Sequence, residues 1–170
     1  MQNPDTTSLA TRSAGTRWLG LLGFIVVAGA AGFVGNLLQG DDVGARYLTF
    51  DRPAWAPPQE AFGIVWPILY LLIGIAGWRV WRSAGGLRAA SLPLGLWGAQ
   101  LVLNAIWPGV FFGINEFGLA IPVIVALAVA VVATIVAFAR VDRIAAWLLV
   151  PYLVWILYAA ALNVALWVMN

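Results

Sequence analysis

The sequence predicts an all-α integral membrane protein that folds as a bundle of five transmembrane helices. Of its 170 residues, 63% are hydrophobic and only 9% are charged, whereas a soluble domain carries about 25% charged residues. The charged residues also leave five long apolar stretches between them, and each stretch can supply the roughly 20 residues that cross a bilayer as a helix. A soluble globule is therefore excluded. The lack of strands with alternating polarity argues against a membrane β-barrel.

The elements are expected in a simple order along the chain. Residues 1–17 are polar and rich in Ser, Thr and Gly, which predicts a disordered N-terminal tail. Residues 18–170 then form one membrane domain, with helices at about 18–40, 61–82, 90–113, 117–139 and 144–168. The first helix exceeds the roughly 7–15 apolar residues of a signal peptide core, so we expect it to be retained. Residues 41–60 hold three prolines within 53–58 and predict a stiff lid.

Arginine is distributed unequally between the two ends of this bundle. Five spans place the termini on opposite faces of the membrane, and seven of the nine arginines fall on the N-terminal face. Because cytoplasmic loops accumulate Arg and Lys, we expect a cytoplasmic N-terminus and an outward-facing 41–60 loop. The Ala- and Gly-rich composition without lysine favours a bacterial cell membrane.

Several classes of function are excluded or disfavoured by composition. The chain contains no His and no Cys, so we expect no metal site, no thiol catalysis and no strong axial ligand for haem iron. A net charge of +2 is too small for nucleic-acid binding to be the main activity. No span carries an ionisable Asp, Glu or Arg away from its ends, which disfavours ion-coupled transport. No obligatory cofactor is expected.

Polar and aromatic side chains instead gather on three of the spans, beneath the 41–60 lid. The third span repeats such residues on one helix face, and the second and fifth spans add further groups at helical spacing. An apolar cavity with a few polar groups binds hydrophobic small molecules. The alternative is that the amides hydrogen-bond across helices and the tryptophans form interfacial belts. The residues from these spans are Trp66, Tyr70, Gln100, Asn104, Trp107, Phe111, Tyr152, Trp155, Ala159 and Asn163.

Two further sets of residues suggest partners. Arg46 and Arg52 are the cations of the lid face. Two partners are equally compatible with them: the carboxylates of a ligand and the phosphates of lipids. Gly95, Gly98 and Ala99 of the third span permit close helix approach, either at a homodimer seam or inside one bundle.

Four motifs resemble one known family when they are taken together and in order. These are Pro53-x-Trp55-x-Pro57-Pro58, Trp66-x-x-x-Tyr70, Gln100-x-x-x-Asn104-x-x-Trp107-x-x-x-Phe111-Phe112 and Trp147-x-x-x-Pro151-Tyr152-x-x-Trp155 followed by Leu162-Asn163. Over about residues 18–168 the chain resembles the translocator protein family, also called tryptophan-rich sensory proteins or peripheral-type benzodiazepine receptors.

The resemblance implies a five-helix bundle, commonly dimeric, that binds porphyrins and haem and, in some members, sterols and benzodiazepine-type drugs. It also implies a ligand pocket formed by Tyr47, Trp55, Trp66, Asn104, Trp107, Trp155 and Ala159. Trp66 and Trp155 match tryptophans that are linked in some bacterial relatives to light-dependent breakdown of protoporphyrin. Two features depart from the family pattern. Arg46 stands where relatives often have Trp, and no basic residue follows Tyr158, so cholesterol binding of the animal type is not expected.

Taken together, the residues and the resemblance predict a membrane receptor or translocator. It would bind protoporphyrin IX or haem under the lid and act in tetrapyrrole regulation or stress signalling. One alternative is a light- and oxygen-dependent porphyrin-degrading activity, in which Trp66 and Trp155 donate electrons. Another is a membrane scaffold whose association with a partner is biased by the ligand. Without an axial ligand, free-base porphyrin should bind about as well as haem.

Overall fold

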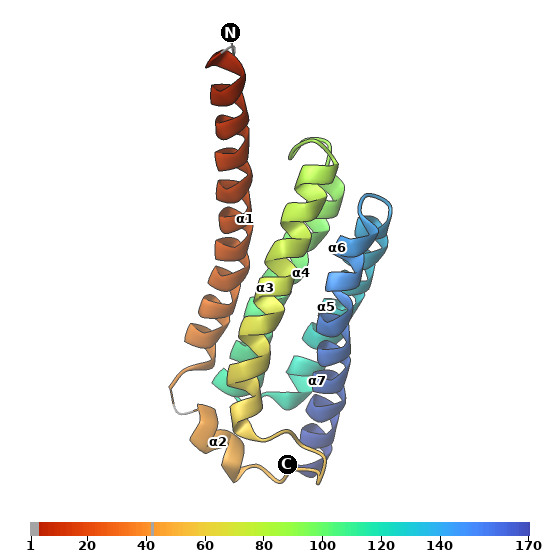
Figure 1. Cartoon of the computed structure of the whole chain (residues 1–170). Coiled ribbons are helices and arrows are strands. Elements are labelled where there is room, and N and C mark those ends of the chain that lie inside the picture. Colours follow the sequence, from red (N-terminus) through yellow and green to blue (C-terminus); the bar gives the residue numbers. More distant parts are fainter. Residues whose placement is uncertain (1–3, 42) are drawn as a thin grey trace.

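The computed structural model describes the chain at residues 4–41 and 43–170, with side chains from Trp18 onward. All of its regular elements in this part of the chain are helices, running in antiparallel fashion along one bundle (Figure 1). They are α1 (Pro4–Gln39), α2 (Val43–Thr49), α3 (Gln59–Ser83), α4 (Ser91–Pro108), the π-helix η1 (Gly109–Gly113), α5 (Phe117–Ala139), α6 (Arg143–Leu148) and α7 (Val150–Met169). Of the disordered tail predicted over 1–17, residues 1–3 lie outside the described residues, and residues 4–17 belong to α1 instead.

Five segments are long and apolar enough to cross a membrane, which confirms the predicted fold class. They are Trp18–Gln39, Gln59–Ser83, Ser91–Gly113, Phe117–Ala139 and Arg143–Met169. Each agrees with the range predicted from hydropathy to within two residues at either end. The start of α1 and the C-terminus lie at opposite ends of the bundle, as an odd number of spans requires (Figure 1). This chain is therefore a multi-pass membrane protein.

Prolines shape two of the spans. Pro108 ends the α-helical part of the third span, and the chain continues as the π-helix η1. Proline lacks the backbone N–H and its ring crowds the preceding turn, which favours such a change of helical pitch. Pro151 occupies the first turn of α7, directly after the break at Leu149 that separates α6 from α7. There the missing N–H costs nothing, because the first N–H groups of a helix have no partner in the helix.

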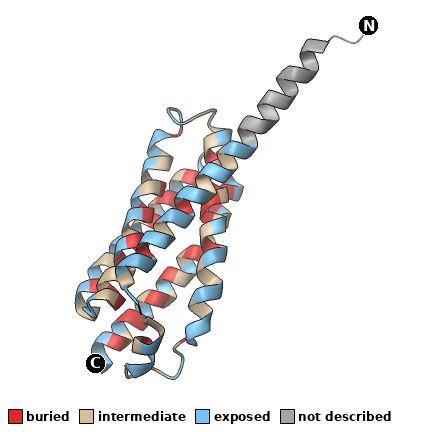
Figure 2. Cartoon of the chain, turned by 90° about the vertical axis from the view of Figure 1, so that its left-hand side faces the viewer, coloured by how far each residue is buried: buried red, intermediate tan, exposed pale blue. Residues whose placement is uncertain are grey.

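The helices form a ring in which α1 contacts α3 and α4, and α5 contacts α4, α6 and α7. The ring closes where α3 meets α6 and α7. Gly74 of α3 allows a close backbone approach to α1, since a Cβ at this position would lie 2.8 Å from the Cα of Ile25. Buried residues face the inside of the ring, whereas the outward surface is exposed and rich in large apolar side chains (Figure 2). Such a surface suits contact with lipid.

Among the described residues, a partly buried ion pair joins the end of the bundle opposite the lid. Arg79 of α3 contacts Asp142 with an N–O distance of 2.9 Å, and Ser83 donates to the same carboxylate. Asp142 also caps α6 by accepting hydrogen bonds from the backbone N–H groups of Ile144 and Ala145. Burial acts to raise the pKa of Asp142, but the hydrogen bonds from Ala145, Arg79 and Ser83 outweigh it, so the pKa is lowered. This contact ties α3 to the α5–α6 turn.

The lid contains a helix that the proline pattern does not predict. Residues Val43–Thr49 form α2, and the segment from Phe50 to Pro58 is non-helical. The hydroxyl of Thr49 donates to the backbone carbonyl of Arg46, which satisfies one carbonyl at the end of this short helix. The expected stiff lid is therefore half helix and half proline-rich loop.

Candidate functional site

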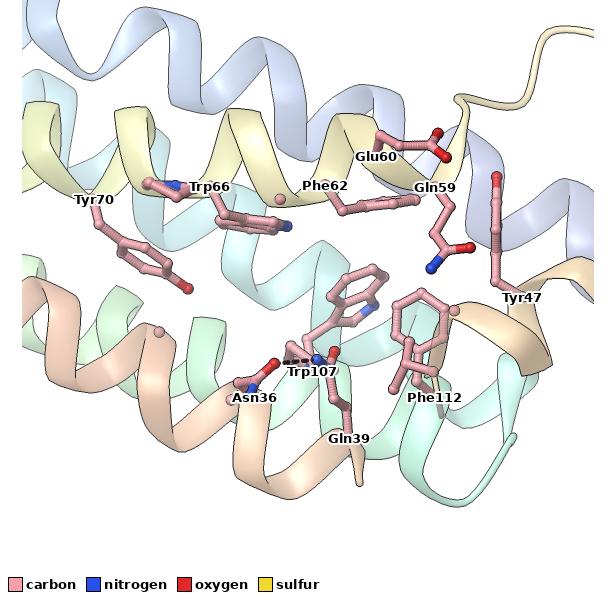
Figure 3. Close-up of a pocket in the computed structure, with 17 residues that line it drawn as sticks. Asn36, Gln39, Tyr47, Gln59, Glu60, Phe62, Trp66, Tyr70, Trp107 and Phe112 are labelled. Atoms are coloured by element: carbon pink, nitrogen blue, oxygen red, sulfur yellow. Dashed lines mark hydrogen bonds between the residues drawn. The ribbon is translucent and has the colours of Figure 1, made fainter. Parts of the chain in front are cut away.

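A cavity of about 480 Å³ lies between α1, α2, α3 and the junction of α4 with η1 (Figure 3). Its volume falls in the range of about 300–1,000 Å³ that is typical of small-molecule sites. Helices α5, α6 and α7 contribute no residue to its wall among the described residues. The wall consists of Gly32, Gly35, Asn36, Gln39, Val43, Gly44, Tyr47, Gln59, Glu60, Phe62, Gly63, Trp66, Pro67, Tyr70, Trp107, Pro108 and Phe112.

Six aromatic side chains line the cavity. On α3, Trp66 stacks on Tyr70 with ring centroids 5.5 Å apart and an interplanar angle of 24°. Nearer the lid, Phe62 meets Tyr47 and Phe112 edge-on, at centroid distances of 5.5 Å and 6.3 Å. Flat rings with this mixture of faces and edges suit a flat aromatic ligand, because offset-stacked and edge-to-face contacts are the favoured geometries.

The inner end of the cavity is closed by Tyr70. Its ring lies so close to Gly32 of α1 that a Cβ there would overlap it. The Tyr70 hydroxyl donates a 2.6 Å hydrogen bond to Oδ1 of Asn104, on α4. Glycine at position 32 is thus required for the closure of the cavity by a ring from α3.

Behind Tyr70, a buried chain of hydrogen bonds crosses from α3 to α4 and α7. Asn104 Nδ2 donates to the Tyr152 hydroxyl at 3.0 Å, and this hydroxyl donates to Gln100 Oε1 at 2.9 Å. Gln100 Nε2 in turn donates to the backbone carbonyl of Trp97. Each of these polar groups therefore has a hydrogen-bond partner, either on another helix or, for Gln100 Nε2, within α4. Buried amides and hydroxyls require such partners in an apolar surrounding.

A second buried contact joins the third span to α7. Trp107 Nε1 donates to Asn163 Oδ1 at 3.2 Å, and Asn163 Nδ2 donates to the backbone carbonyl of Phe117. On the other side of the cavity wall, Trp155 packs edge-on against Trp66 with centroids 6.5 Å apart. The Nε1 atom of Trp155 is buried and has no hydrogen-bond partner among the described residues.

Arg46 holds the lid to the two helices beneath it. Its guanidinium donates to the carbonyl of Phe112 at 2.7 Å, of Gln39 at 2.7 Å and of Asp41 at 3.2 Å. The first of these carbonyls belongs to η1 and the second ends α1. Three walls of the cavity are therefore joined by one side chain.

Tyr47 carries the lid over the cavity. Its ring is buried, and its hydroxyl donates to the carbonyl of Pro57 at 2.9 Å. The guanidinium of Arg52 lies over the ring, 4.8 Å from its centroid. Burial raises the pKa of Tyr47, although the neighbouring Arg52 acts in the opposite direction. The lid is anchored further by the Tyr158 hydroxyl of α7, which donates to the carbonyl of Trp55.

The profile of the TspO/MBR family matches residues 24–168. This chain belongs to the TspO/MBR family.

Curated members of the family are similar to the chain over most of their length. The translocator protein of Homo sapiens is 36% identical over 151 residues, which cover 88% of this chain and 89% of the human protein. The tryptophan-rich sensory protein of Cereibacter sphaeroides is 36% identical over 146 residues, covering 86% and 88%. Protein CrtK of Rhodobacter capsulatus is 34% identical over 147 residues, covering 86% and 90%. These names, with the family match, support a translocator or sensory role.

In this TspO/MBR protein, four of the twelve ligand-binding residues predicted from the sequence line the cavity: Tyr47, Trp66, Tyr70 and Trp107. Trp55 lies on the outer lid surface, with 48% of its area exposed. The other residues pack behind the wall, where most of their polar groups bond across helices. They are Gln100, Asn104, Phe111, Tyr152, Trp155, Ala159 and Asn163.

The wall also contains residues that the motif analysis does not select. These are the amides Asn36, Gln39 and Gln59, the rim residue Glu60 and the rings of Phe62 and Phe112. Asn36 and Gln39 carry the clearest sequence signal, because they are polar, three positions apart and placed at the end of an otherwise apolar span. The two lid arginines of this chain do not lie on the wall. Arg46 contacts backbone carbonyls and Arg52 contacts Tyr47, and neither lines the cavity.

Proposed function

We propose that this TspO/MBR protein binds tetrapyrroles, such as protoporphyrin IX or haem, in the cavity under α2. In this role it acts as a membrane sensor or translocator in tetrapyrrole regulation or stress signalling. The names of its relatives support a sensory or translocating role, and the chemistry of the cavity supports a flat aromatic ligand.

The observation that carries the proposal is the wall itself. Six aromatic side chains surround a volume of about 480 Å³, and no cysteine or histidine is present in the sequence. Burial of ring surface supplies the affinity at about 25 cal/mol per Å², and association and ordering costs offset a large part of it. Affinity in the micromolar range is the natural result.

The test is a titration of the purified protein with protoporphyrin IX in the dark, followed by quenching of tryptophan fluorescence. Trp66→Phe removes an indole from the cavity wall, whereas Trp147→Phe changes an exposed indole at the far end of the bundle. We expect saturable binding that Trp66→Phe weakens roughly threefold to tenfold and that Trp147→Phe leaves unchanged. Non-saturable quenching that is equal in all three proteins contradicts the proposal. Haem should bind about as well as the free base.

A light-dependent reaction is the second candidate, and the position of Trp66 favours it. Trp66 lines the cavity and contacts Trp155, so it could donate an electron to a light-excited porphyrin, with oxygen as co-substrate. Illumination in air should then bleach bound protoporphyrin IX, and Trp66→Phe and Trp155→Phe should both suppress the bleaching. Equal bleaching in the two variants and the unaltered protein argues decisively against the reaction.

The third span offers a surface for self-association. Gly95 and Gly98 have open space where a Cβ would lie, and Ala99 is exposed. A homodimer through this face is compatible with close helix packing, and a ligand that shifts its stability would make the protein a scaffold. The dimer fraction should fall in Gly95→Leu, and it should change with protoporphyrin IX if the scaffold role holds. If neither Gly95→Leu nor protoporphyrin IX changes the dimer fraction, the scaffold role has no support.

A further inference from the structure

Apart from Glu60, the polar side chains on the cavity wall are uncharged, and they include the three amides Asn36, Gln39 and Gln59. Gln39 Nε2 donates to Asn36 Oδ1 at 2.6 Å, which leaves the Asn36 amide nitrogen free to face a ligand. Gln59 extends from α3 toward Gly44 and makes no hydrogen bond with any described residue (Figure 3). The hydroxyls of Tyr47 and Tyr70 already donate to other residues. Donors available to a ligand are therefore neutral.

The cations near the cavity are engaged elsewhere. Arg46 is bonded to three backbone carbonyls, and Arg52 lies over the ring of Tyr47. Among the described residues, the charged side chain on the wall is Glu60, which lies at the rim beside the lid. Its negative charge opposes a carboxylate rather than attracting one.

Recruiting Arg46 to a ligand carboxylate would undo part of the site. The guanidinium would have to leave the carbonyls of Gln39 and Phe112, and both of these residues form the wall. Carbonyls left without a partner in an apolar environment cost more than the net gain of an ordinary hydrogen bond. A carboxylate that stays without a cation in the cavity pays a larger desolvation cost.

The open side of the cavity also faces a medium that disfavours charge. Tyr70 closes the inner end against Gly32, and Gln59 fills the space beside Gly44 at the lid end. The remaining side, between α1 and α3, has a rim formed by exposed Asn36, Gly63 and Pro67, all within membrane-spanning segments. A ligand that enters here comes from the hydrocarbon phase, in which uncharged molecules dissolve far better than carboxylates.

We propose that the cavity recognises an uncharged flat ring and does not recognise ligand carboxylates. This inference rests on the proposed tetrapyrrole binding and specifies its chemistry. The ring is held by aromatic faces and amide donors, and any acidic substituents contribute nothing to affinity. For a porphyrin, the neutral ester is therefore a ligand at least as good as the free acid.

The test compares protoporphyrin IX with its dimethyl ester, titrated in the dark into the protein in lipid nanodiscs. Two substitutions distinguish binding in the cavity from partitioning of the porphyrin into lipid. Both replace glycines at which an added side chain would meet open space. Gly63→Trp places a large side chain at the cavity rim, whereas Gly23→Trp places it on α1 away from the wall. The saturable component should disappear in Gly63→Trp and persist in Gly23→Trp.

We expect the ester to bind within threefold of the acid or more tightly, and Arg52→Gln to leave the ratio of the two affinities unchanged. Removal of the rim charge by Glu60→Gln should improve binding of the acid, by up to about fivefold, and leave the ester unaffected. Glu60 is exposed, so this variant is expected to fold.

Two outcomes overturn the inference, and they are distinguishable. Tenfold tighter binding of the acid, abolished by Arg46→Gln or Arg52→Gln, shows carboxylate recognition and leaves tetrapyrrole binding intact. Absence of any saturable binding of either porphyrin overturns tetrapyrrole binding and this inference together.

Discussion

Arg46 of α2 donates a 2.7 Å hydrogen bond to the carbonyl oxygen of Phe112, in the π-helix that ends the third span. A π-helical turn presents carbonyls that ordinary α-helical pairing does not occupy in the same way, and such turns are frequent at functional sites. Here one such carbonyl receives a charged donor from the lid. The position of the lid therefore depends on a side chain for which the sequence predicts ligand carboxylates or lipid phosphates as partners.

Replacement of Arg46 should loosen the lid. Arg46→Leu removes the charged donor from three carbonyls, and we expect a loss of roughly 2 kcal/mol in the free energy of unfolding. Cleavage by a protease between residues 50 and 58 should become faster. Arg88→Leu, at an exposed position in the α3–α4 turn, is the control and should alter neither quantity. Equal cleavage rates in the two variants would show that Arg46 does not hold the lid.

The hydrogen-bond chain behind the cavity should behave as one unit. Asn104→Ala leaves the hydroxyls of Tyr70 and Tyr152 without their amide partner, and we expect a loss of about 1–2 kcal/mol. A double-mutant cycle with Tyr152→Phe should show a coupling free energy of about 0.5 kcal/mol or more. The measurement is reversible unfolding in mixed detergent micelles. Additive losses in the double variant would indicate that the two side chains act independently.

Because of Asp142, the free energy of unfolding of the bundle should decrease as the pH falls into the acidic range. Its pKa in the folded protein is lowered by hydrogen bonds that outweigh the effect of burial, so its contribution is complete above the unfolded pKa of about 4. The contribution is lost as the pH falls through the lower folded pKa. Asp142→Asn retains a side-chain cap for α6 and removes the charge that pairs with Arg79. Unfolding midpoints of this variant and the unaltered protein should differ at pH 6 and converge toward pH 3; a constant difference contradicts the linkage.

Hydropathy was sufficient to predict the five spans, because a helix that crosses a bilayer must be apolar along its whole length. A helix that is apolar on all sides has no sequence pattern that marks its inward face, so the cavity wall was only partly predictable. Trp66 and Tyr70 were found through their spacing, whereas Phe62 and Phe112 resemble any other apolar residue of a span. Gln100 and Asn104, predicted to bind the ligand, are buried behind the wall, where hydrogen bonds with Tyr70, Tyr152 and a backbone carbonyl satisfy them. Arg46 could not be placed from sequence, because its partners are backbone carbonyls.

The arginine distribution predicts how the bundle is oriented in the membrane, and the sequence allows a direct test. The chain has no cysteine, so a single introduced cysteine reports one position. Ala54→Cys lies on the exposed lid and Ala89→Cys on the exposed α3–α4 turn at the other end of the bundle. In intact bacterial cells, a membrane-impermeant maleimide should label Ala54→Cys at once and Ala89→Cys only after permeabilisation, because the arginine-rich end stays in the cytoplasm. The reverse pattern would show that the protein inserts with its lid inside, and the cavity would then receive its ligand from the cytoplasmic leaflet.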